Sequence, residues 1–337
     1  MIDLVVAGGG PAGLATAIHA ARAGLETVVI EKRSGPIDKA CGEGLMPHAV
    51  RQLNLLGATP AGRTFRGISY FDERRSVTAH FANGSGFGVR RKTLHAALLT
   101  EADRAGVKIV HDKVGPLAQD AESVTVNGIA ARYLAAADGL HSPIRSALGL
   151  ELSPGRTKRW GLKRHIAIAP WSDFVEVYWS DHTEAYITPV ADDCVGIAIL
   201  TSKQGRFEHH IDAFPELRER IDGLPHEPDR AAGPLRQRVR TRVAGRVMLV
   251  GDAAGYVDAL TGEGLGLAFT ASKLLVDCIV ADRPGDYERQ WRKATQRYRL
   301  LTGGLLRAAT SPVRSVIVPA ACRLPRVFSG VVNLLAD

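Results

Sequence analysis

A glycine-rich segment near the start of the chain places the tightest limit on its fold. Residues 8–13 read Gly-Gly-Gly-Pro-Ala-Gly and contain the spacing GxGxxG. They follow an apolar run at 2–7 and precede a segment with apolar residues at helical spacing, and a second apolar run lies at 27–30. Strand, glycine turn, helix and strand in this order form a βαβ unit, in which the turn lets the backbone approach a diphosphate. The sequence therefore predicts an α/β fold with a dinucleotide-binding turn.

Two later motifs suggest that other parts of the chain reach the same ligand. Residues 137–145 match the pattern DGxxSxxR, and residues 250–254 read Val-Gly-Asp-Ala-Ala after a predicted strand. Residues 261–264, Thr-Gly-Glu-Gly, then open a predicted helix whose positive end favours an anionic ring. The Asp-Gly and Gly-Asp dipeptides in these motifs are, on their own, common in turns. All three motifs in this order indicate one ligand, with Glu31 placed to bind an adenosine ribose and Asp252 a polyol hydroxyl.

The pattern of predicted strands divides the chain into discontinuous parts. Residues 66–91 and 160–200 contain short alternating segments typical of antiparallel strands, and they interrupt the α/β pattern. We therefore expect an α/β domain built from residues 1–65, 92–155 and 240–285. An antiparallel substrate-binding sheet is expected from residues 66–91 and 156–239, and a C-terminal helical cap from 286–337, broken into short helices at Pro312, Pro319 and Pro325.

Together these motifs resemble the FAD-dependent oxidoreductases of the aromatic-hydroxylase (class A flavin monooxygenase) and geranylgeranyl-reductase superfamily, over roughly residues 2–280. The resemblance implies an FAD-binding, Rossmann-like domain of glutathione-reductase type, an inserted antiparallel-sheet substrate domain and a C-terminal helical segment. It implies FAD as the cofactor. Because a second GxGxxG is absent from the sequence, NADH or NADPH is expected as a transiently bound electron donor.

Carried over residue by residue, the resemblance implies a set of cofactor contacts. They are Gly8, Gly10, Pro11, Ala12, Gly13, Glu31, Lys32, Arg33, Cys41, Gly42, Arg91, Asp138, Gly139, Gly251, Asp252, Gly262, Glu263, Gly264 and Leu265. Arg90 is the alternative to Arg91 at the helix start. Cys41 lies in a loop similar to the Cys-Gly loop of geranylgeranyl reductases, and Cys41 and Tyr186 are the candidate catalytic residues.

The substrate-side residues leave the reaction open. Residues 184–189, Glu-Ala-Tyr-Ile-Thr-Pro, lack the Trp and Phe of the reductases' YxWxFP segment and resemble a hydroxylase strand more closely. The WxWxIP element of halogenases is also missing. The first hypothesis is therefore a monooxygenase of secondary metabolism that hydroxylates an aromatic or polyketide-like compound with NAD(P)H and O₂, through a flavin C4a-hydroperoxide. The alternatives are an FAD-dependent reductase of an apolar alkene and a non-catalytic flavin-binding protein. His48, His165 and His182 are candidate bases.

The formal net charge of +8 comes from the last third of the chain, where residues 230–337 hold 17 basic and 8 acidic side chains. No nucleic-acid-binding motif is present in this segment, so the pattern does not favour nucleic acid. A cap over the substrate opening is the first interpretation, and peripheral membrane contact is the second. Four scattered cysteines, no metal-ligand motif and no signal peptide predict a cytoplasmic protein without a metal. A monomer or weak homodimer is expected, and the sequence leaves the oligomeric state open.

Overall fold

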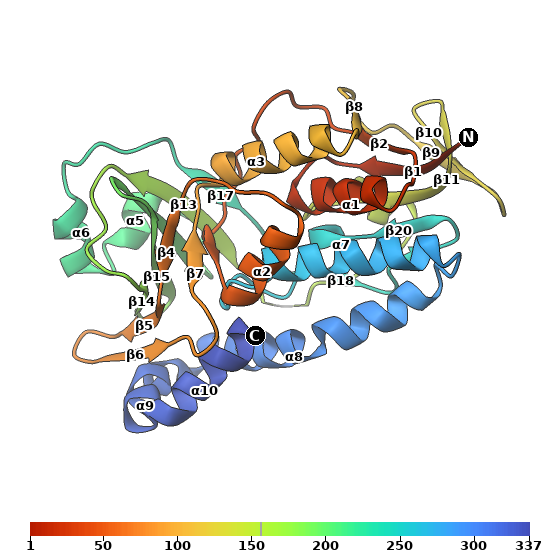
Figure 1. Ribbon diagram of the computed structural model, residues 1–337. Coiled ribbons are helices and arrows are strands. Elements are labelled where there is room, and N and C mark those ends of the chain that lie inside the picture. Colours follow the sequence, from red (N-terminus) through yellow and green to blue (C-terminus); the bar gives the residue numbers. More distant parts are fainter. Residues whose placement is uncertain (156) are drawn as a thin grey trace.

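The computed structural model describes residues 1–155 and 157–337 (Figure 1). An eight-stranded sheet, hereafter the cofactor sheet, has the order β19-β20-β11-β1-β2-β8, and β10 and β9 extend it from β11. Its strands are β1 (Ile2–Ala7), β2 (Thr27–Ile30), β8 (Lys108–Val110), β9 (Leu117–Gln119), β10 (Val124–Val126), β11 (Ile129–Ala136), β19 (Val243–Ala244) and β20 (Val247–Leu249). Strand β1 lies in its centre because residues 4–7 are fully buried and apolar, as parallel strands covered on both faces require.

Strand β1 pairs in parallel with β2 and β11, and β11 pairs in parallel with β20. The carboxyl ends of β1, β11 and β20 therefore meet at one edge, and each of the three sequence motifs follows one of these strands. Helices α1 (Pro11–Arg22), α3 (Arg91–Arg104) and α7 (Gly264–Val280) belong to this part of the molecule. The hydroxyl of Thr16 on α1 donates to the hydroxyl of Ser272 on α7 at 3.0 Å, which joins the first and last cofactor segments.

A seven-stranded sheet, hereafter the substrate sheet, has the order β17-β13-β16-β15-β14-β5-β6. Its strands are β5 (Gly67–Phe71), β6 (Ser76–His80), β13 (Trp160–Ile166), β14 (Val175–Trp179), β15 (Thr183–Ala191), β16 (Cys194–Thr201) and β17 (Arg230–Ala232). The predicted antiparallel pairing is found except between β14 and β5, which are parallel. No hairpin joins these two strands, because the chain crosses the cofactor sheet between them, so turn geometry does not set their direction.

Smaller elements complete the framework. A three-stranded sheet consists of β3 (Gly44–Leu45), β7 (Gly86–Gly88) and β4 (Arg63–Phe65), and β12 (Glu151–Leu152) pairs with β18 (Arg238–Val239). Short helices α2 (Pro47–Leu55), α4 (Pro143–Ala147), α5 (Phe207–Ile211) and α6 (Pro215–Ile221) fill the connections. Phe207, Phe214 and Leu217 pack α5 and α6 against Ile197 and Ile199 on one face of the substrate sheet. The other face of that sheet is left for the C-terminal segment.

The C-terminal segment contains α8 (Asp286–Ala309), the 3₁₀ helix η2 (Pro312–Val316), α9 (Ile317–Arg323) and α10 (Pro325–Ala336). Pro312 and Pro325 start helices as predicted, but the prediction of a break at Pro319 is wrong. Pro319 lies in the first turn of α9, where its missing N–H leaves no helical bond unmade. Helix α10 packs beside β6, as Figure 1 shows. Among the described helices none is long and apolar enough alone to cross a membrane, although 312–323 and 325–336 together pass that test with a bend of 104°.

The glycine turn provides a stability test. A Cβ on Gly13 would lie 1.8 Å from the carbonyl oxygen of Gly8, whereas a Cβ on Gly304 in the exposed part of α8 would meet no atom within 4 Å. We expect Gly13→Ala to lower the free energy of unfolding by at least about 3 kcal/mol, because backbone must move. The control Gly304→Ala should raise it by about 0.5–1 kcal/mol. Urea unfolding of both variants tests this, and equal effects would contradict the packing described.

Candidate functional site

A cavity of about 950 Å³, hereafter the cofactor cavity, extends from the carboxyl edge of the cofactor sheet to the substrate sheet. Residues of all three sequence motifs line one part of it: Gly10, Pro11, Ala12, Asp138, Gly139, Gly251, Asp252, Gly262, Gly264 and Leu265. Lys32, Cys41, Gly42, Arg91 and Tyr186, also named from the sequence, line it too. The fold therefore brings most of the predicted site residues to one cavity.

The glycine turn packs directly against the DG motif. Gly8 has a φ of +108°, and a Cβ there would lie 2.5 Å from the carbonyl oxygen of Ala137. From α3, the Nε2 atom of His95 lies 2.7 Å from the carbonyl oxygen of Gly9 and holds the turn from the other side. His95 was missed by the sequence analysis because its position on a helix gives no local signal. The turn is thus fixed at Gly8 and Gly9, while the following residues Gly10 and Ala12 line the cavity, where backbone can approach a ligand.

Glu31 lies behind the turn, and it is not among the residues that line the cofactor cavity. Its carboxylate accepts hydrogen bonds from the backbone N–H of Gly9 at 2.9 Å and from Nε of Arg33 at 2.8 Å. Burial opposes ionisation of this carboxyl, but these hydrogen bonds outweigh it and lower the pKa of Glu31. Glu31 and Arg33 therefore shape the turn in this structure. Their contact with an adenosine ribose stays a prediction.

The arginine of the DGxxSxxR motif joins the second motif to the third. Arg145 is 1% exposed, and its guanidinium donates to the carbonyl oxygens of Ala253 at 3.2 Å and Leu140 at 2.9 Å. Asp138 accepts from the N–H of Ile144 at 3.0 Å through one oxygen, while its other oxygen is buried without a partner among the described residues. The DGxxSxxR motif therefore mainly holds the second and third motifs together, and one carboxylate oxygen of Asp138 is available to a ligand.

Asp252 faces the cofactor cavity from η1 (Gly251–Ala254). Its side chain is open to the cavity but surrounded by protein, and this desolvation raises the pKa of its carboxyl, while the charges of Lys39 and Arg91 oppose the rise. Lys39 also lines the cavity, and burial lowers the pKa of its amine. A hydrogen-bonding carboxylate between two cations suits a polar chain that carries hydroxyl and phosphate groups.

The cavity walls meet the requirements for FAD. A Cβ added at Gly10, Gly42 or Gly262 would meet no atom within 4 Å, so these glycines border open space that a side chain would fill. The Nε atom of Arg91 is buried and has no partner within the described part of the chain. Glycine-bordered backbone, Asp252 and cationic groups therefore form a cradle of the size and polarity that a dinucleotide needs. The remaining wall, toward the substrate sheet, is mainly apolar.

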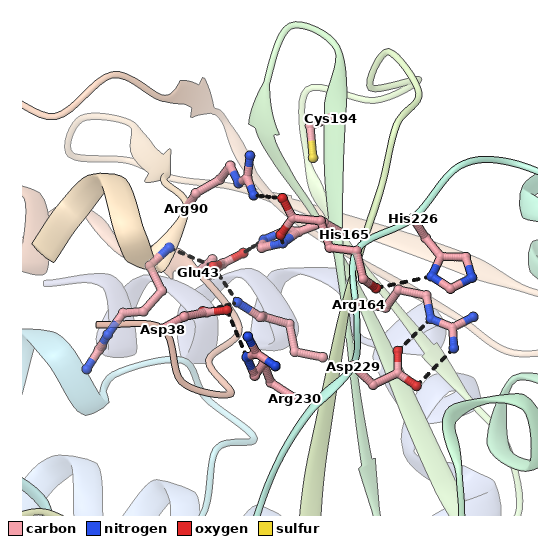
Figure 2. A network of polar contacts seen from close by, with 12 residues as sticks. Asp38, Glu43, Arg90, Arg164, His165, Cys194, His226, Asp229 and Arg230 are labelled. Atoms are coloured by element: carbon pink, nitrogen blue, oxygen red, sulfur yellow. Dashed lines mark hydrogen bonds and ion pairs between the residues drawn. The ribbon is translucent and has the colours of Figure 1, made fainter. Parts of the chain in front are cut away.

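The loop that carries Cys41 is held against the substrate sheet by a buried ionic network (Figure 2). Glu43, with φ of +59° and 2% exposure, accepts from the N–H of Arg91 at 2.6 Å and from Nζ of Lys163 at 3.1 Å. Lys163 also donates to Asp38 at 2.9 Å. Because Arg91 starts α3 and Lys163 lies on β13, Glu43 ties the Cys41 loop both to helix α3 of the cofactor part and to the substrate sheet. The sequence analysis missed Glu43, since its partners are 48 and 120 residues away.

His165 completes the same network and is not available as a free base. Its Nε2 atom lies 2.6 Å from Glu43 and its Nδ1 atom lies 3.0 Å from Glu227, which also pairs with Arg90. Arg90 therefore belongs to this network, whereas Arg91 faces the cofactor cavity. His48 contacts the hydroxyl of Thr270, and His182 is exposed in the turn after β14. None of these three histidines lines the cavity.

Of two further residues predicted from the sequence, Tyr186 lies at the cavity wall and Glu263 lies outside the cavity lining. The hydroxyl of Tyr186 donates to the carbonyl oxygen of Leu260 at 3.1 Å, at the cavity wall, and burial raises the pKa of this phenol well above its ordinary value. Glu263 does not line the cavity. It is 4% exposed, one of its carboxylate oxygens has no partner in the described structure, and burial raises its pKa to about 8 against the opposing charge of Arg297.

Comparison with known proteins agrees with this geometry. The family model of an FAD binding domain matches residues 1–282. Menaquinone reductase of Mycolicibacterium smegmatis is 27% identical, with 88% of this chain and 80% of that protein aligned. Digeranylgeranylglycerophospholipid reductase 2 of Methanosphaera stadtmanae is 26% identical, with 85% and 80% aligned. The solved structure of the flavin-dependent brominase Bmp2 superposes with a TM-score of 0.83 at 17% identity, covering 99% of this chain and 93% of that one, which shows the shared fold.

The buried carboxyl of Glu263 predicts a pH dependence of stability. The folded state keeps a proton up to about pH 8, whereas the unfolded chain releases it near the ordinary value of 4.5. Stability contributed at this site therefore falls as pH rises from 4.5 to 8. Glu263→Gln cannot ionise, so its stability relative to the unchanged protein should grow over that range, by roughly 4 kcal/mol at pH 8. Urea unfolding from pH 5 to 8 measures this, with a substitution of the exposed Glu122, Glu122→Gln, as control. The prediction is wrong if the free energy of unfolding of Glu263→Gln and of the unchanged protein changes with pH in the same way.

Proposed function

The chain belongs to the family defined by this FAD binding domain, and on that premise we propose that it is a reductase that saturates a double bond in the isoprenoid chain of an apolar lipid. The sequence alone favoured a monooxygenase. The observation that carries the reductase instead is the apolar part of the cofactor cavity. Beyond Cys41, its wall is formed by side chains of β5, β14, α9 and α10, among them Ile68, Val177, Ile317, Leu324 and Phe328.

This wall suits a long hydrocarbon better than a small ring. Helices α9 and α10 contribute Ile317, Ala320, Ala321, Leu324, Val327, Phe328, Val331, Val332 and Leu335 to it. A polyprenyl chain laid along them would leave water and gain roughly 25 cal/mol for each Å² of apolar surface buried. The names of the two reductase relatives, which concern a polyprenyl quinone and a digeranylgeranyl lipid, support the same substrate class.

The proposed reaction consumes one NAD(P)H and one proton and converts one C=C bond into CH–CH, with release of NAD(P)⁺. Bound FAD would supply the two-electron carrier between donor and substrate. The residues of the chain orient the lipid, exclude water from the reacting bond and hold the loop that carries Cys41. The N–H of Glu43 donates to the sulfur of Cys41 at 3.4 Å, so the ionic network that holds Glu43 also fixes the position of this thiol. We propose that Cys41 contacts the substrate beside the flavin.

A monooxygenase remains the second candidate because several aromatic side chains also line the cavity. Phe65, Tyr70, Tyr186, Tyr256 and Phe328 are among them. They would suit an aromatic substrate, and that reaction would require O₂ and insert one oxygen atom into the product. The two candidates therefore differ in a measurable requirement.

An anaerobic assay separates the candidates. With FAD-loaded protein, NADPH or NADH, and menaquinone in detergent micelles, we expect one donor oxidised per double bond saturated, without oxygen, and a product heavier by two hydrogen atoms. Turnover that requires O₂ and adds one oxygen atom would support the monooxygenase. A flavin that neither donor reduces would instead favour the non-catalytic flavin-binding protein. Cys41→Ser should lower the rate by roughly tenfold at unchanged FAD content, whereas the control Cys322→Ser should not, since Cys322 lies outside the cavity lining.

An apolar substrate also requires a route into the cavity, and we propose that the C-terminal helices face a membrane surface. Val313, Val316, Leu324, Val327, Val331 and Leu334 in this segment are each between 38% and 59% exposed. Residues 289–336 contain nine basic side chains and no acidic one. Exposed apolar residues beside arginines, next to the apolar wall of the cavity, suit a bilayer with anionic headgroups.

Vesicle flotation tests this orientation. We expect the protein to float with vesicles that contain phosphatidylglycerol and to bind pure phosphatidylcholine vesicles less. Leu324→Glu should reduce flotation by roughly tenfold, because it buries a charge in the interface. The control Leu55→Glu changes a leucine of similar exposure, 66% against 57%, on the separate helix α2 and should have no effect. Equal flotation of the two variants would refute the proposed membrane face.

A further inference from the structure

A second cavity, of about 370 Å³, adjoins the cofactor cavity and is lined by arginines, and we call it the arginine cavity. Six arginines line it: Arg236, Arg238, Arg240, Arg242, Arg292 and Arg299. It shares wall residues with the cofactor cavity, namely Gly251, Asp252, Tyr256, Gly264 and Ala268. Neither the sequence motifs nor the proposed reduction of a lipid uses these arginines.

Local geometry directs the six side chains into one space. Arg236, Arg238, Arg240 and Arg242 come from the segment around β18, and each of them borders this cavity. Arg292 and Arg299 are seven residues apart on α8, which places them two turns apart on one helix face. Arg242 lies 4.0 Å from the ring centre of Trp291, and its Nε donates to the carbonyl oxygen of Ala254 at 3.0 Å. The cavity is therefore held between α8 and η1.

Most of this positive charge has no counter-charge on the protein. Glu288 pairs with Arg242 at 3.1 Å and with Arg292 at 2.5 Å. Within residues 1–155 and 157–337, the four other arginines form no ion pair, although Arg238 donates to the carbonyl oxygen of Ser153 at 3.3 Å. Asp252 is the carboxylate in the cavity lining, and it also faces the cofactor cavity. Burial lowers the pKa of Arg242, and the neighbouring Arg299 and Arg292 act in the same direction.

We propose that the arginine cavity binds the phosphate groups of a nucleotide, and that its occupant is the NADPH or NADH that reduces the flavin. The identity of the occupant rests on the proposed function. Guanidinium groups bind phosphate oxygens in pairs, and a dinucleotide carries the clustered negative charge that four unpaired arginines require. A second glycine-rich motif is absent from the sequence, so these arginines take the role that a helix N-terminus has in a dinucleotide-binding domain.

The position of the cavity suits this occupant. Asp252 and Gly264 separate it from the cradle assigned to FAD, so a donor anchored by its phosphates lies next to the flavin-side loop. Inorganic pyrophosphate and the headgroup of phosphatidic acid share the same phosphate chemistry. The binding experiment therefore includes both as separate probes.

Calorimetric titration of the FAD-loaded protein with NADP⁺ and NAD⁺ tests the site without turnover. The double variant Arg238→Glu/Arg240→Glu should weaken binding of the preferred dinucleotide by at least roughly tenfold, because it removes two phosphate contacts and adds repulsion. FAD content should stay unchanged. The control Arg323→Glu/Arg326→Glu makes the same change in net charge at the end of α9 and the start of α10, outside both cavity linings, and should retain affinity. Equal affinity in the two double variants would overturn the proposal.

The other probes identify the source of the phosphate. Binding of pyrophosphate or of phosphatidic acid vesicles that is lost in Arg238→Glu/Arg240→Glu, with no binding of either dinucleotide, would overturn the assignment to the donor. Tight NADP⁺ or NAD⁺ binding that the double variant loses supports it. Because binding is measured without lipid, a failure of the reductase assay with intact dinucleotide binding would count against the proposed function and leave this site in place.

Discussion

The structure depends on the close backbone contact between the glycine turn and the ends of two neighbouring strands. Gly13 packs against the carbonyl of Gly8, and Gly8 packs against the carbonyl of Ala137, at distances that exclude any side chain. Arg145 then extends the contact to the third strand by donating to the backbone of Ala253. Three segments more than a hundred residues apart thus form one edge, and the cofactor cavity exists because their backbones, and not their side chains, approach each other.

A second constraint joins this edge to the substrate sheet. Glu43 is nearly fully buried and satisfies its carboxylate with Lys163, His165 and the backbone of Arg91. Burying charges is costly unless each is paired, so such a network specifies one arrangement of loop and sheets more than it adds stability. Its effect is to hold Cys41 and the neighbouring glycines against the cofactor cavity. The same network uses His165 and Glu227, which explains why a histidine on the substrate sheet is a structural group here.

The basic last third of the chain separates into surfaces with different surroundings. The arginines of residues 236–242 line the arginine cavity together with Arg292 and Arg299 of α8, whereas Arg323 and Arg326 lie among exposed apolar residues where α9 meets α10. The same helices place apolar side chains on the wall of the cofactor cavity, as expected for a cap. A single value of net charge could not separate these surfaces, because it carries no information on which arginines point into a common space. The support for reduction over hydroxylation has a similar origin, since the apolar wall is built from β5, β14, α9 and α10, of which β5, α9 and α10 are distant in sequence from the strand that contains Tyr186.

The sequence by itself determined the cofactor half of the protein. A GxGxxG turn, a DGxxSxxR segment and a Gly-Asp pair, each after a buried strand, define the fold class and predict a set of residues most of which line the cofactor cavity, because glycine spacing and strand order are local properties. Only the tertiary structure decided the rest. It placed Glu31 behind the turn and Glu263 outside the cavity, it set β5 parallel to β14, and it brought His95, Lys39 and Glu43 to the site. These outcomes depend on contacts between residues distant in the chain, whose pairing is set by packing and by the need to satisfy buried charges.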